Sequence, residues 1–350
     1  INNRKMKFLF LANGLGEIAQ GAAVAQHARE EKIDCRFVNT VPTCHRYITE
    51  LNFDSFLLSN LSPSKIRESV DRRIEEYSPD VIFCCNSKTT QGMFHPDKEL
   101  DSLIVSLDSN WLFQGMPAYF DMFFVCFPPE IFKKNRNYNL SDPRIKPVGF
   151  IPSGYDIHES EILSAKKELG ISNEKMIFSY FGRGVTFRSF LVDKVLDAIE
   201  LLNRDGKRAK LFLLSDLKIE KDNVISIRWL KNDREYNRCL AASDCVVCHH
   251  GMPTISKAIL AKVPIISFVP GVLKGVKPSE TCEVEPFEEL GLCITLTYSS
   301  EPNLLKRMLE DVVFGSKGEE MRREQGKHGI KGEKVVLSEI SSLLKKRERK

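Results

Sequence analysis

A histidine, a glycine and a threonine follow an apolar segment in the second half of the sequence, at His249, Gly251 and Thr254. The residues around them predict a strand over 244–248, a tight turn and a helix over 254–261. Gly251 lets a ligand approach the backbone closely, and the first turn of a helix offers N–H groups and a positive dipole end. His249 and Thr254 can both donate hydrogen bonds. The pattern therefore predicts an anion site suited to a phosphate.

Structural explanations fit the same residues. Thr254 could be the N-cap of the helix, and His249 could be a packed residue at the end of a strand. Cys245, Cys248 and His249 also match C-x-x-C-H, the spacing that attaches c-type haem. Strand geometry argues against haem and zinc, because side chains three residues apart on a strand face opposite ways, about 10 Å apart along the chain.

The elements that position these residues alternate between strands and helices, twice over. Continuous apolar stretches indicate strands covered on both faces, and helical spacers between them indicate parallel pairing. Ligands bind at the carboxyl ends of such strands. We expect strands over 6–12, 35–38, 81–85, 103–107, 123–127, 175–181, 209–214, 224–227, 244–248, 263–269 and 293–296, and helices over 18–31, 187–202, 235–242, 254–261 and 302–314.

The length of 350 residues indicates about two domains at roughly 150 residues each. Two prolines and two glycines between Pro147 and Gly154 are typical of a connector. We therefore expect an α/β protein with a Rossmann-like domain over 1–150 and a second over 151–318. A C-terminal helix over 319–350 should pack back on the first domain.

Composition excludes other classes of protein. Apolar residues make up 42% and charged residues 28%, which is typical of a globular protein, and a net charge of +4 is too balanced for a dedicated nucleic-acid binder. No apolar segment approaches the roughly 20 residues of a membrane span, and no signal peptide is evident. We expect a cytoplasmic protein with reduced cysteines. The basic segment Lys345–Lys350 fits either weak contact with an anionic membrane surface or simple solvation.

The segment from Asp244 to Pro270 resembles the donor-binding segment of UDP-sugar-dependent GT-B glycosyltransferases. That family includes the N-acetylglucosaminyltransferase of peptidoglycan synthesis and the UDP-glucuronosyltransferases. Its members carry a strand, then H-x-G-x-x-[ST], an Ala-rich helix, G-x-P and an apolar strand that ends in proline. The resemblance implies two Rossmann-like domains whose parallel sheets face a central cleft. It also implies that His249, with His250, and Thr254 hold the diphosphate of a nucleotide sugar.

Weaker matches extend the resemblance on the donor side, although each also fits a structural role. A Gly-rich turn meets the pyrophosphate in the family, an aromatic residue stacks on uracil, and an acidic residue accepts hydrogen bonds from donor hydroxyls. The corresponding residues here are Gly182, Arg183, Gly184 and Thr186 for the turn, Trp229 for the aromatic residue and Glu280 for the acid.

The N-terminal loop with Gly14 and Gly16 resembles the loop that shapes the acceptor side in this family. Glu17 stands where many members have a histidine, which in some of them is the catalytic base. Glu17 could act as the base if burial raises its pKa, or it could simply be favoured by the helix dipole. Asp108, which follows a predicted strand, is the second candidate base, and His95 lies in another loop on the acceptor side.

The sequence departs from the family at Lys257, where many members have a glutamate that binds the donor ribose. A cation cannot accept those hydrogen bonds, so the base and sugar of the donor stay open, with a UDP-sugar expected. The resemblance implies metal-independent transfer of a hexosyl or N-acetylhexosaminyl group, without a cofactor. The acceptor hydroxyl could belong to a small molecule, a glycan or a lipid-linked molecule. A nucleotide-sugar epimerase or hydrolase, and a non-catalytic nucleotide-binding relative, remain alternatives on the same fold.

Overall fold

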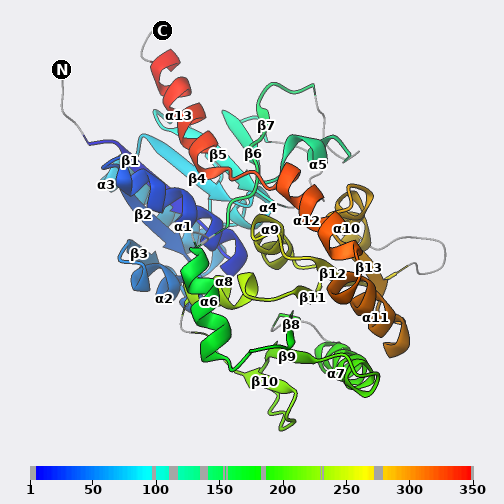
Figure 1. Cartoon of the computed structure of the whole chain (residues 1–350). Helices are drawn as coiled ribbons and strands as arrows, with labels where there is room; N and C mark the ends of the chain where they lie inside the picture. Colours follow the sequence, from blue (N-terminus) through cyan, green and yellow to red (C-terminus); the bar gives the residue numbers. More distant parts are fainter. Residues whose placement is uncertain are drawn as a thin grey trace. The chain divides into compact units, whose positions relative to one another are not determined.

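The chain forms two compact units in the computed structural model (Figure 1). Unit 1 comprises Ile1–Ser153 and Lys331–Lys350, and unit 2 comprises Gly154–Ile330. The side chains of 279–282 are not described. The structure describes residues 5–96, 100–109, 117–134, 141–152, 154, 157–182, 187–228, 230, 232–271 and 279–347.

Unit 1 contains a parallel sheet of seven strands in the order β3-β2-β1-β4-β5-β6-β7. The strands are β1 (Lys7–Leu11), β2 (Asp34–Asn39), β3 (Asp54–Leu57), β4 (Val81–Cys85), β5 (Leu103–Asp108), β6 (Met122–Val125) and β7 (Ile145–Pro147). The helices are α1 (Leu15–Glu30), α2 (Pro42–Glu50), α3 (Pro63–Tyr77), α4 (Ser87–Thr90), α5 (Pro129–Lys133) and α13 (Glu333–Arg347).

Unit 2 contains a parallel sheet of six strands in the order β10-β9-β8-β11-β12-β13. The strands are β8 (Lys175–Tyr180), β9 (Ala209–Leu214), β10 (Val224–Ile227), β11 (Cys245–His249), β12 (Ile265–Val269) and β13 (Ile294–Thr297). The helices are α6 (Glu159–Glu168), α7 (Arg188–Arg204), α8 (Asp233–Ala241), α9 (Met252–Leu260), α10 (Ser279–Glu289), α11 (Pro302–Leu309), the π-helical turn η1 (Glu310–Phe314) and α12 (Lys317–His328).

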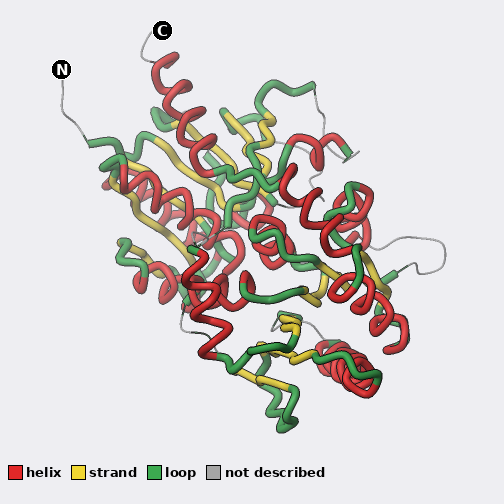
Figure 2. Tube along the Cα trace, in the orientation of Figure 1, coloured by secondary structure: helices red, strands yellow, loops and turns green. Residues whose placement is uncertain are grey.

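The two sheets share one topology, with strands and helices alternating along the chain (Figure 2). In each unit the first strand pairs with the second on one side and with the fourth on the other, so the strand order reverses there. The reversal lies between β1 and β4 in unit 1 and between β8 and β11 in unit 2. This arrangement confirms the predicted α/β class with two Rossmann-like halves. Ligands of open α/β sheets bind where the order reverses, at the carboxyl ends of the strands.

The C-terminal region differs from the expectation of one helix over 319–350. It forms two helices, of which α12 belongs to unit 2 and α13 to unit 1. The second helix packs against α1 and adds Val336, Leu337 and Ile340 to the core of unit 1. The chain therefore returns to unit 1 after Ile330 rather than after residue 318. Among the described helices, none combines the length and the apolar character needed to traverse a bilayer.

Three aspartates hold neighbouring strands in register through the same pair of backbone hydrogen bonds. Each aspartate lies just before a strand, and its carboxylate accepts a hydrogen bond from an N–H group in the neighbouring strand. The aspartate's own N–H group donates to the carbonyl oxygen of that residue of the neighbouring strand. The pairs are Asp80 with Lys7 (2.8 and 2.8 Å), Asp121 with Ile104 (2.8 and 2.8 Å) and Asp244 with Met176 (2.9 and 2.7 Å).

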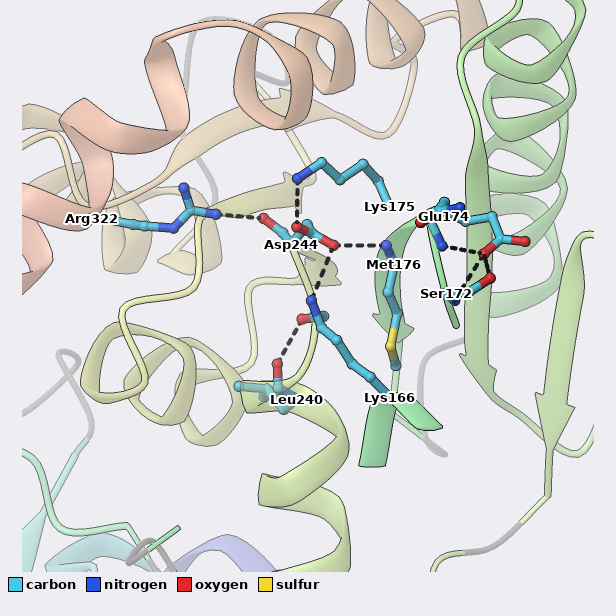
Figure 3. Close-up of polar contacts among 10 residues, drawn as sticks. Lys166, Ser172, Glu174, Lys175, Met176, Leu240, Asp244 and Arg322 are labelled. Carbon is cyan, nitrogen blue, oxygen red and sulfur yellow. Dashed lines mark hydrogen bonds and ion pairs between the residues drawn. The ribbon is translucent and has the colours of Figure 1, made fainter. Parts of the chain in front are cut away.

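Asp244 adds further contacts to this pair of hydrogen bonds, and it positions β11 beside β8 (Figure 3). Its Oδ1 lies 3.0 Å from Lys175 Nζ, its Oδ2 lies 3.8 Å from Lys166 Nζ, and its backbone carbonyl accepts a hydrogen bond from Arg322. We expect Asp244→Ala to lower the free energy of unfolding by about 2–3 kcal/mol, because the Met176 N–H group would lose its acceptor and Lys175 its counter-charge.

Urea denaturation followed by circular dichroism measures this loss. Asp244→Asn should lose less of the free energy of unfolding, because its amide oxygen can still accept the hydrogen bond from the Met176 N–H group. The matched control is Glu220→Ala, which removes an exposed ion pair with Lys218 and should change the stability by less than about 0.5 kcal/mol. An Asp244→Ala protein as stable as that control would contradict the role given to Asp244.

Candidate functional site

The candidate site of unit 2 is the turn between β11 and α9, at the point where the strand order reverses. β11 ends at His249, and the Gly251 N–H group donates to the His249 carbonyl oxygen at 2.7 Å. Gly251 is the N-cap of α9 and provides no side-chain cap. Thr254 is the third residue of the helix, so the alternative that Thr254 is the N-cap is wrong.

The first turn of α9 offers fewer backbone donors than the pattern predicts. Pro253 is the second helical residue and has no N–H group, and the Thr254 N–H group already donates to the Gly251 carbonyl at 3.1 Å. The dipole of α9 still favours an anion at this end. Specific hydrogen bonds to a bound anion would therefore come mainly from side chains.

The His249 ring lies against Gly251, and a Cβ atom at that glycine would be 2.8 Å from His249 Cε1. No side chain larger than hydrogen fits there unless the ring moves. Burial lowers the His249 pKa to about 4, with a further contribution from His250, and the backbone of Tyr180 opposes the shift. Among the described residues, no group forms a hydrogen bond with the buried Nδ1. Burial therefore favours the neutral form of this imidazole, and the Nδ1 atom without a hydrogen bond is itself buried.

We expect the His249 pKa to make the protein acid-sensitive. Because the native pKa of about 4 lies below the usual 6.5, the unfolded chain binds more protons between these values. Stability should be fully present above about pH 6.5 and fall as the pH drops to 4, by up to roughly 3 kcal/mol. Urea unfolding at several pH values should show this loss, and His249→Gln should lack it. An NMR titration in which His249 gains its proton near pH 6.5 would contradict the expectation.

Thr254 is 4% exposed, and its hydroxyl lies 2.9 Å from the Tyr236 hydroxyl of α8. Burial raises the Tyr236 pKa well above its usual value, so the phenol keeps its proton and can donate to Thr254. Lys257 lies one turn further along α9, with Nζ 4.9 Å from the centre of the Tyr236 ring and 3.4 Å from Asp233 Oδ1. Burial lowers the Lys257 pKa, and Asp233 opposes that shift. These residues form a polar layer beside the turn, in which Thr254 and Lys257 are buried and Tyr236 and Asp233 are partly exposed.

Tyr236 and Asp233 were missed in the sequence, because their contacts with α9 join residues 18 and 24 positions apart. His250 was expected, and its Nδ1 lies 3.3 Å from the Tyr298 hydroxyl, which follows β13. Gly182 lies just after β8, beside the end of β11, with a positive φ of 70°. Arg183, Gly184, Thr186 and Trp229 lie outside the described residues. Glu280 is in α10, but its side chain is not described.

In unit 1, Gly14 is the N-cap of α1, and Gly16 and Glu17 follow in its first turn. The Glu17 carboxylate folds back against Gly14, where any Cβ atom would collide with it. Burial and the Glu17 charge together raise the pKa of the Cys44 thiol to about 11. Glu17 is half-buried and lies in the first turn of α1, just after the carboxyl end of β1.

Asp108 ends β5 at the same edge of the unit 1 sheet, but it is only 1% exposed. Its Oδ2 accepts a hydrogen bond from the Ser87 hydroxyl at 3.0 Å. His95 is exposed in the loop after α4, with its ring centre 5.4 Å from that of Tyr119. Of the two candidate bases, Glu17 is therefore the less buried residue.

Comparison with known proteins extends the likeness over nearly the whole chain. No protein-family model matches the sequence, and no curated protein matches it. The glycosyltransferase SnogD from Streptomyces nogalater matches with a TM-score of 0.68 and 14% identity over 97% of this chain and 100% of its own. MurG from Acinetobacter baumannii matches with a TM-score of 0.65 and 13% identity, also over 97% of this chain and 100% of its own. A Listeria monocytogenes protein provisionally assigned as a UDP-N-acetylglucosamine 2-epimerase matches with a TM-score of 0.67 and 12% identity, over 98% of this chain and 97% of its own. The chain therefore has the GT-B fold, the two-domain α/β fold of these glycosyltransferases.

Proposed function

We propose that this protein is a glycosyltransferase that moves a sugar from a nucleotide-diphosphate donor to an acceptor hydroxyl. The observation that carries the proposal is the turn from His249 to Thr254. The His249 imidazole and the buried Thr254 hydroxyl flank the positive end of α9, at the reversal point of the unit 2 sheet. The fold, and the glycosyltransferases that share it, support the same class of reaction.

In the proposed reaction the acceptor oxygen attacks the anomeric carbon of the donor sugar, and the bond from that carbon to the diphosphate breaks. The acceptor proton passes to a carboxylate of unit 1, for which we propose Glu17, with Asp108 as the alternative. The charge that develops on the departing diphosphate is stabilised by His249, Thr254 and the α9 dipole. These groups perform this role without a metal ion, and UDP is the nucleotide we expect.

Incubation with UDP-glucose or UDP-N-acetylglucosamine, with and without a mixture of acceptor alcohols, tests the proposal. Mass spectrometry should detect a glycosylated acceptor in the mixture, and the donor should stay unchanged when no acceptor is present. Isomerised donor without acceptor would indicate an epimerase, and free sugar at the same rate with or without acceptor would indicate a hydrolase. Either result would replace transfer as the function.

The epimerase alternative has one supporting observation, the likeness to the Listeria protein. Against it, the sequence places Ser256, Lys257 and Ala258 where that enzyme family usually has consecutive acids. In the structure Lys257 is buried and paired with Asp233, so this position holds a cation in place of an acid pair.

We further propose that the enzyme works in the reducing environment of the cytoplasm. The nine described cysteines are all buried and unbridged. Burial raises the pKa of their thiols, for example to about 12 in Cys84 and Cys248. Thiols of this kind are inert components of a core, which fits a compartment where disulfides are not formed.

A further inference from the structure

Two phenylalanines at the start of α7 are exposed where apolar side chains are usually buried. Phe187 is 56% exposed and Phe190 is 49% exposed, whereas Leu191, Val192 and Val195 of the same helix are buried in the core. Single exposed apolar residues need no explanation, but neighbouring exposed aromatic rings are typical of a binding surface. Since α7 follows β8, these rings lie at the carboxyl end of the unit 2 sheet.

A chain of ring contacts connects these residues to the candidate phosphate site. The Phe187 ring centre lies 5.9 Å from that of Tyr298. The Tyr298 hydroxyl lies 3.3 Å from His250 Nδ1, and the rings of His250 and His249 are 5.1 Å apart. The contacts therefore run from the buried imidazole beside Gly251, across the ends of the strands, to an exposed aromatic surface.

The second phenylalanine, Phe190, is restrained by a lysine of the same helix. Lys194 Nζ lies 4.4 Å from the centre of the Phe190 ring and donates a hydrogen bond to the Ser300 carbonyl at 2.7 Å. The bond to Ser300 positions the lysine, and the attraction between its charge and the ring restrains Phe190. Exposed aromatic rings that are held in this way lose little conformational entropy when a ligand covers them.

We propose that Phe187, Phe190 and Tyr298 form the subsite that receives the sugar ring of the donor, with Tyr298 and His250 facing its hydroxyl groups. This inference rests on the proposed function. The sugar is bonded directly to the diphosphate, so a diphosphate held at His249 places the sugar beside the neighbouring groups, which begin with His250. A pyranose has faces of C–H groups with partial positive charge, and these match the negative faces of aromatic rings. Its hydroxyls need polar partners at the rim, which Tyr298 and His250 supply.

Paired titrations separate the sugar from the nucleotide. Wild type, Phe187→Ala and Phe190→Ala are titrated calorimetrically with UDP and UDP-glucose, and with dTDP and dTDP-glucose as a second pair. Each alanine variant should bind the nucleotide sugar about 5- to 10-fold more weakly and the free diphosphate within twofold of wild type. Phe187→Tyr should restore the affinity for the nucleotide sugar. Leu163→Ala, which removes a 63% exposed apolar side chain from α6, is the matched control and should change neither affinity.

The outcomes distinguish this subsite from the proposed function. If wild type binds no diphosphate, the proposed function fails and the subsite fails with it. If wild type binds the diphosphate and the variants weaken the nucleotide sugar and the free diphosphate equally, the rings support the nucleotide or the fold and the subsite is wrong. It is also wrong if the variants bind both ligands like wild type, in which case the exposed rings belong to a surface for an apolar acceptor or to none.

Discussion

Thr254→Val should lower the affinity for a nucleoside diphosphate about 10- to 100-fold and the transfer rate about 10²- to 10³-fold. Valine has the shape of threonine but no hydroxyl, so the variant removes one donor to an anion in a buried site. A hydrogen bond to a charged group contributes about 1.5–3 kcal/mol, and the loss of one preformed donor to developing charge has the larger effect on rate. Calorimetry measures the affinity, and the mass-spectrometric assay measures the rate.

Tyr236 provides the control that separates this role from packing. Tyr236→Phe removes the hydroxyl 2.9 Å from Thr254 and leaves the ring between Phe178 and Lys257. If Tyr236 orients Thr254, the double variant should bind the diphosphate no more weakly than Thr254→Val alone. Thr254→Ser should keep most of the affinity. A Thr254→Val protein that is folded and binds the diphosphate like wild type would contradict the assignment of the turn.

Glu17→Gln should lower the transfer rate about 10²- to 10⁴-fold and leave the affinity for the diphosphate unchanged. Glutamine has the shape of glutamate but cannot take a proton, and a positioned general base contributes a factor of this size. The acidic limb of the pH–rate profile, which reports protonation of the base, should disappear with it. Rates at saturating donor, measured from pH 5 to 9, test both effects.

Two variants act as controls for Glu17. Glu30→Gln, at the other end of α1, should leave the rate unchanged. Asp108→Asn should mainly lower stability, because Asp108 is buried and accepts a hydrogen bond from Ser87. If instead Asp108→Asn abolishes transfer in a stably folded protein while Glu17→Gln is fully active, Asp108 is the base and the role given to Glu17 is wrong.

The strands could be predicted from the sequence where they are covered on both faces. The segments expected over 81–85 and 209–214 coincide with β4 and β9, because a continuous apolar segment is typical of a strand inside a parallel sheet. β3 and β7 were missed. They are edge strands of unit 1 in which no residue is fully buried, so their composition is not apolar.

The candidate site could be predicted only where its residues are consecutive in the chain. His249, Gly251 and Thr254 lie in one turn, so their spacing indicates a strand, a glycine and the start of a helix. Tyr236 and Tyr298 reach the same turn from α8 and from the end of β13, and no local pattern indicates that. The reduced number of backbone donors in α9 follows from Pro253. The pattern of histidine, glycine and threonine does not specify the residue at that position, so the pattern alone did not predict this reduction.

Calorimetric titration of the full chain with UDP, GDP and dTDP tests most directly whether the loop after β11 is built for a nucleotide's phosphates. We predict saturable binding of at least one of them below millimolar concentration, lost or greatly weakened in His249→Ala. If all three fail to bind at millimolar concentration, or bind His249→Ala as tightly as wild type, the loop does not hold a donor and the glycosyltransferase assignment is wrong.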